Sequence, residues 1–79
     1  MEQFTIVLRG YDINAVERLI GVASEALASG SPTERETAVR ELREPDLRIR
    51  FRGYDRFQVD AALRLLVDEL SDDTAGEAG

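Results

Sequence analysis

The chain has 79 residues with ten basic and 16 acidic side chains, a net charge of −6, and neither cysteine nor histidine. These absences exclude disulfides, thiolate metal sites and a histidine base. Because the chain also lacks a glycine-rich phosphate loop and a serine nucleophile elbow, we expect no enzyme, no cofactor and no metal site.

The first segment predicts a strand followed by a helix. Residues 4–9 (FTIVLR) are β-branched and apolar with a period of two, which is typical of a short strand. Gly10 permits a turn, and Asp12 is a preferred residue at a helix N-cap. Apolar residues then recur at helical spacing as far as Leu27, which predicts an amphipathic helix.

The middle segment predicts a short connecting helix over residues 32–44. Ser31, Pro32 and Glu34 form a typical helix start, and Pro45 ends the helix because proline disfavours helical geometry in the residue before it. A helix of about 12 residues, roughly 18 Å long, would return the chain to its starting end and so favours antiparallel strands. Four glutamates indicate a solvated helix face rather than a metal cluster: Glu34, Glu36, Glu41 and Glu44.

The second strand and helix repeat the first pair. Residues 47–52 (LRIRFR) alternate between apolar and arginine side chains, which predicts a half-buried strand with a wet arginine face. Gly53 and Asp55 follow as turn and cap, and the apolar spacing up to Leu70 predicts a second amphipathic helix. The small, acidic residues 71–79 predict a disordered tail.

The tetrapeptide RGYD occurs at residues 9–12 and again at 52–55, within two longer similar segments. A shift of 43 positions sets residues 4–27 over residues 47–70, with apolar residues on apolar ones. We therefore predict a single α+β domain over residues 1–70, ordered strand-helix-helix-strand-helix, with a two-stranded antiparallel sheet packed on the helices and an internal pseudo-twofold repeat. The expected core takes equivalent residues from the two copies: Ile6, Leu8, Val16, Ile20 and Leu27, and Ile49, Phe51, Val59, Leu63 and Leu70.

Both copies resemble the N-terminal motif of the DivIVA family, in which an apolar residue precedes R-G-Y-D and a valine follows four residues after the aspartate. FRGYDRFQVDAALRLL (51–66) matches it closely, and FTIVLRGYDINAVERLI (4–20) keeps the upstream Phe-Thr, with leucine in place of the usual phenylalanine. The resemblance implies a lipid-binding head, dimeric in the family, whose long coiled coil builds scaffolds at bacterial poles and division sites. Here the tandem copies would replace the two subunits, and the long coiled coil has no counterpart.

The resemblance also implies that an aromatic residue beside an arginine is exposed at the turn and touches the membrane. The corresponding pairs are Phe51-Arg52 and, in the first copy, Leu8-Arg9. Strand alternation instead places Phe51 and Leu8 in the core. The sequence therefore leaves two alternatives for these side chains, exposed at the turn or buried in the core.

Three functions follow from these features. The first is a non-enzymatic DivIVA-like protein-interaction module of bacterial cell division or polar growth, with unidentified protein partners and weak homodimerisation. The alternatives are a peripheral membrane or polyanion binder that uses the arginine-rich second strand, and a small cytoplasmic adaptor that keeps only the fold. The candidate contact residues are Arg9, Arg48, Arg50, Phe51, Arg52 and Arg56, and the residues expected to build the turns and caps are Gly10, Tyr11, Asp12, Gly53, Tyr54 and Asp55.

The charge and hydropathy pattern bears on location and partners. An acidic chain is repelled by the phosphate backbone, so we expect no nucleic acid partner. No apolar run is long enough to span a bilayer, and the chain start lacks the basic residues of a signal peptide. We therefore expect a cytoplasmic protein, with the inner face of the membrane as its alternative location.

Overall fold

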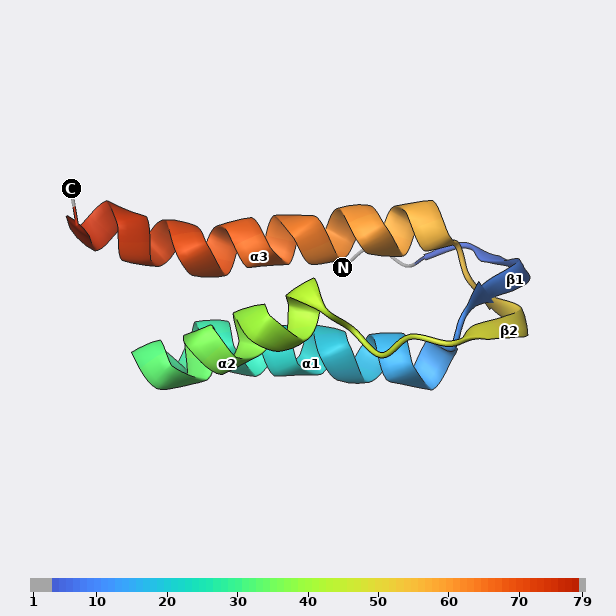
Figure 1. Ribbon diagram of the computed structural model, residues 1–79, viewed down its shortest axis with the longest axis horizontal. Helices are drawn as coiled ribbons and strands as arrows, with labels where there is room; N and C mark the ends of the chain where they lie inside the picture. Colours follow the sequence, from blue (N-terminus) through green and yellow to red (C-terminus); the bar gives the residue numbers. More distant parts are fainter. Residues whose placement is uncertain (1–3, 79) are drawn as a thin grey trace.

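The computed structural model describes residues 4–78, and the side chains as far as Ser71. Three helices lie side by side, and two short strands close one end of the molecule (Figure 1). This confirms the predicted α+β class and the order strand-helix-helix-strand-helix. The elements are β1 (Ile6–Tyr11), α1 (Ile13–Ser29), α2 (Pro32–Arg43), β2 (Ile49–Tyr54) and α3 (Arg56–Ala78).

The two strands form a small, irregular antiparallel sheet. Partner numbers fall along β2 as they rise along β1, from Ile6 opposite Tyr54 to Tyr11 opposite Ile49. Tyr11 also pairs with Tyr54, its equivalent in the other repeat, out of register with the other pairs. The strands therefore cross where the two RGYD motifs meet, and the crossing point lies on the pseudo-twofold axis.

The helix boundaries follow from their capping residues. The Ala15 and Gln58 backbone N–H groups donate to the carboxylates of Asp12 and Asp55, at 3.1 and 3.2 Å, so both RGYD motifs begin a helix as predicted. α1 ends at Gly30, which adopts the left-handed conformation at φ 73° that a residue without Cβ tolerates. The Glu34 N–H donates to Ser31 Oγ and starts α2.

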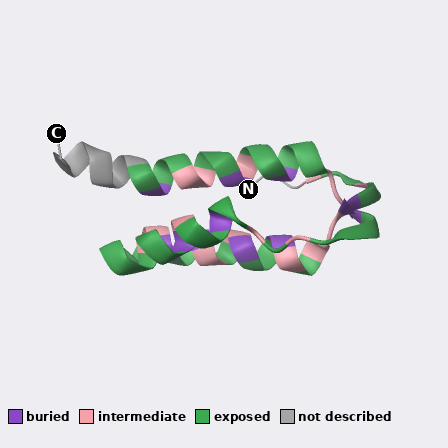
Figure 2. Ribbon diagram, in the orientation of Figure 1, coloured by how far each residue is buried: buried purple, intermediate pink, exposed green. Residues whose placement is uncertain are grey.

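The three helices enclose the core. Both α1 and α3 start at the strand end and run away from it, while α2 returns the chain toward the sheet (Figure 1). The antiparallel arrangement of the strands depends on this return. The buried residues of the helices lie on their inner faces (Figure 2): Val16, Leu19, Ala23, Ala26, Ala38, Leu42, Val59, Leu63 and Leu70.

The predicted core was wrong in the strands. Ile6, Leu8, Ile49 and Phe51 are all exposed, with 64% of Leu8 and 77% of Phe51 accessible to solvent. Alternation buries one face of a sheet only if another layer packs on it, and here the sheet lies beyond the ends of the helices. The core residues predicted in the helices are all buried or half-buried: Val16, Ile20, Leu27, Val59, Leu63 and Leu70.

The last helix is longer than predicted. α3 continues through residues 71–78, the segment for which the sequence predicts a disordered tail, and Gly79 lies outside the described residues. No proline interrupts α3, and Gly76 is the one glycine among its residues.

Candidate functional site

The crossing of the strands depends on two glycines. A Cβ atom on Gly10 would lie 2.4 Å from the Tyr54 carbonyl oxygen, and one on Gly53 would lie 2.2 Å from the Tyr11 carbonyl oxygen. Both distances are far below van der Waals contact, so no other residue fits without separating the strands. The glycine of each RGYD motif therefore serves close backbone approach as well as turning.

Reciprocal backbone hydrogen bonds hold the crossing from both sides. The Asp12 N–H donates to the Arg48 carbonyl oxygen at 2.9 Å, and the Asp55 N–H donates to the Thr5 carbonyl oxygen at 2.8 Å. The two bonds are related by the 43-residue shift of the repeat. Each repeat thus fixes the helix start of the other.

The tyrosine of each motif forms a hydrogen bond with a residue on the helix of the other repeat. Tyr11 Oη donates to Asp60 Oδ1 at 3.1 Å, and Tyr54 Oη donates to Glu17 Oε2 at 2.9 Å. Burial, followed by the hydrogen bond to Asp60, raises the pKa of Tyr11. The pKa of Tyr54 is raised mainly by its hydrogen bond to Glu17. Each tyrosine therefore ties its motif to the helix of the other repeat.

Sequence reasoning missed these partners, although a signal for them exists. Glu17 and Asp60 are equivalent acidic positions, five residues after each cap, so the acidic charge that both keep under the 43-residue shift pointed to a shared role. It also missed Gln58, whose side-chain amide accepts from the Thr5 N–H at 2.7 Å and donates to Thr5 Oγ1 at 3.1 Å. Nothing in the sequence pattern singles out Gln58.

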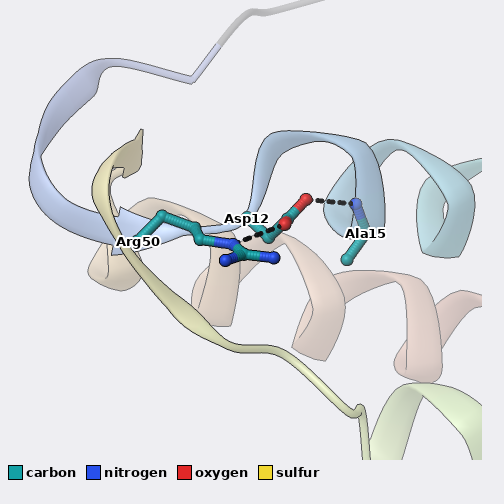
Figure 3. Close-up of polar contacts among 3 residues, drawn as sticks. All are labelled: Asp12, Ala15 and Arg50. Carbon is teal, nitrogen blue, oxygen red and sulfur yellow. Dashed lines mark hydrogen bonds and ion pairs between the residues drawn. The ribbon is translucent and has the colours of Figure 1, made fainter.

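One ion pair breaks the pseudo-symmetry. Arg50 Nε donates to Asp12 Oδ2 at 2.8 Å, while Asp12 Oδ1 accepts from the Ala15 N–H (Figure 3). The hydrogen bond from Arg50, followed by that from Ala15, lowers the pKa of Asp12 below its ordinary value. The position equivalent to Arg50 in the first repeat is Val7, so among the described residues Asp55 has no counterpart of this ion pair.

The exposed strand residues form the outer end of the molecule, which we call the tip. Arg9 lies there in the left-handed region at φ 62°, a conformation that costs a non-glycine residue about 1–2 kcal/mol. A hollow of about 450 Å³ opens between Leu8, Arg9, Ile49, Arg50 and Phe51. The tip comprises Ile6, Leu8, Arg9, Ile49, Arg50, Phe51 and Arg52, all exposed.

The remaining predicted contact residues flank the tip. Arg48 is exposed and lines a second hollow of about 320 Å³ with Arg18, Arg50, Asp12 and Asp46 among its other residues. Arg56 is exposed on the first turn of α3. The structure therefore brings Arg9, Arg50, Phe51 and Arg52 together at the tip, with Arg48 and Arg56 behind it.

We also searched the described residues for a metal site and for a membrane-spanning helix. Among them, no group of three acidic side chains is placed to hold a metal ion. No helix within residues 4–78 combines the length and apolar character needed to cross a bilayer. Comparison of the chain with protein-family models, curated proteins and solved structures gives no match.

Proposed function

We propose that this protein is a non-enzymatic, DivIVA-like attachment module that binds anionic membrane surfaces through its tip. The observation that carries the proposal is the exposure of Leu8 and Phe51, each next to an arginine, at one end of an elongated molecule. An apolar side chain that has no layer to cover it within the chain can be buried in the interfacial region of a bilayer.

The charge distribution supports an end-on orientation. β1 and β2 contain Arg9, Arg50 and Arg52 and no acidic residue, so all 16 acidic side chains lie elsewhere in the chain. Anionic lipid attracts the basic tip, whereas it repels the acidic helices. This polarity explains how a chain of net charge −6 binds a negative surface in a single orientation.

The expected strength is modest. Full burial of a leucine or phenylalanine side chain contributes about 1.5–3 kcal/mol, and an arginine near an anionic surface contributes about 1 kcal/mol. Only a few such groups are available per chain. Binding should therefore be reversible, and it should weaken with salt because screening removes the arginine contribution.

Co-sedimentation with vesicles tests the proposal. The protein should sediment with phosphatidylglycerol vesicles at low salt, and less at high salt or with phosphatidylcholine vesicles. Leu8→Ser should reduce binding several-fold. Leu65→Ser is the matched control, because Leu65 is equally exposed (66%, against 64% for Leu8) but lies on α3, and it should bind as the wild type does. Equal loss in both variants, or no binding at low salt, would contradict the proposal.

Protein docking is the second candidate, and it retains the role in bacterial division or polar growth that the DivIVA resemblance implies. A groove of about 330 Å³ runs between the end of α2 and α3, with apolar walls at Leu42, Pro45, Leu63 and Val67. Arginines and apolar anchors are the side chains that protein interfaces favour. Two results together would support this second function. The protein should not bind vesicles, and a partner that a pull-down from the host recovers with the wild type should be absent when Val67 is substituted.

A further inference from the structure

The outward face of α3 is apolar and uncovered within the chain. Phe57 and Leu65 are 85% and 66% exposed, and Ala61 between them is also exposed. Their spacing of four residues places them along one ridge of the helix. Val59 and Leu63 bury the opposite face against the other helices, so nothing in the described chain covers this ridge (Figure 2).

A ridge of alternating charge runs beside the apolar one. It reads Arg56, Asp60, Arg64, Asp68, again at a spacing of four, and all four side chains are exposed. Asp60 accepts the hydrogen bond from Tyr11, whereas no ion pair within the described residues engages Arg56, Arg64 or Asp68. The order of signs is therefore plus, minus, plus, minus along the helix.

If a second copy of this ridge lies alongside in the opposite direction, each positive charge comes next to a negative one. We propose that the outward face of α3 binds the same face of a second copy in the antiparallel orientation. With the twofold axis near Ala61, Phe57 lies against Leu65 of the second copy. Arg56 then lies near Asp68, and Asp60 near Arg64, of that copy. A parallel pair would instead place the two charge ridges on opposite sides of the contact, where they could not pair.

The dimensions of the face suit a weak pair. Ala61 at the centre lets the two helices approach to about 8–10 Å, the usual distance between packed helices. The apolar patch is small, so the pair dissociates readily. In this arrangement the two tips lie at opposite ends of the dimer. This face of α3 is separate from the tip, so the pairing does not depend on membrane binding.

Disulfide trapping tests the orientation cleanly because the chain has no cysteine. Phe57→Cys mixed with Leu65→Cys should give a cross-linked heterodimer under mild oxidation, and neither variant alone should cross-link efficiently. Leu8→Cys mixed with Leu65→Cys is the control that should not cross-link. Preferential Phe57→Cys homodimers would overturn the antiparallel arrangement, and a mixture that stays monomeric would overturn the pairing.

Charge exchange tests the same contact without oxidation. Arg56→Asp alone sets Asp against Asp68 of the second copy, and Asp68→Arg alone sets Arg against Arg56. Each variant should dimerise about tenfold more weakly in analytical ultracentrifugation, since two attractive pairs become repulsive. Mixing the two variants should restore dimers at the wild-type level, because both contacts regain opposite charges. A mixture no better than its components would overturn the proposal.

Discussion

Gly10→Ala should destabilise the fold severely, because the strands cross at this residue. The added Cβ would meet three backbone atoms of the other strand at 2.4–2.6 Å, and backbone cannot rotate away. The closest of these contacts must lengthen by about 1 Å to reach ordinary van der Waals distance, as close packing requires. Gly53→Ala should behave in the same way, because it meets the equivalent atoms of β1.

The size of the effect follows from what such a separation disrupts. Overpacking costs about 1–3 kcal/mol, and each hydrogen bond lost between the strands costs about 0.5–1.5 kcal/mol more. The bonds from Asp12 to Arg48 and from Asp55 to Thr5 flank the crossing and would both stretch. We expect a loss of about 2–6 kcal/mol, against a total of about 4–12 kcal/mol for a chain of this length.

Urea unfolding followed by far-UV circular dichroism measures this loss directly. Gly21→Ala is the control, because Gly21 lies within α1, exposed, with nothing within 4 Å of an added Cβ. There, alanine should stabilise by about 0.5–1 kcal/mol, since it favours the helix. A Gly10→Ala midpoint equal to wild type would show that the strands do not cross at this glycine.

Two further predictions concern the arginines. Arg9→Gly should raise the free energy of unfolding by about 1–2 kcal/mol, because it relieves the left-handed conformation at φ 62°. Arg52→Gly, at a residue without positive φ, should lower it, and equal effects in the two variants would refute the strain. Arg50→Gln should raise the pKa of Asp12 in an NMR titration, while Arg52→Gln leaves it unchanged. Because the folded-state pKa of Asp12 is below the ordinary 3.8, its carboxylate stabilises the fold above that pH, and this stabilisation is lost as the pH falls through the folded-state pKa. In Asp12→Asn the free energy of unfolding should therefore fall less steeply with pH in this acidic range.

Local chemistry explains why the sequence predicted the helices well. Asp12, Ser31 and Asp55 cap helices through their own side chains, and Gly30 ends α1 through its own φ angle. Each of these events involves residues within one turn of each other, so the sequence specifies them directly. The repeat likewise predicted two equivalent halves, and with α2 as the return it predicted antiparallel strands.

The exposure of Leu8 and Phe51 was decided only by the tertiary structure. Alternation records that one face of a strand is apolar, but it carries no information about which element covers that face. In this fold the strands cross beyond the ends of the helices, so the apolar side chains face solvent and form the tip. The contacts of Tyr11 with Asp60 and of Tyr54 with Glu17 likewise arise from the crossing, which brings together groups 49 and 37 residues apart.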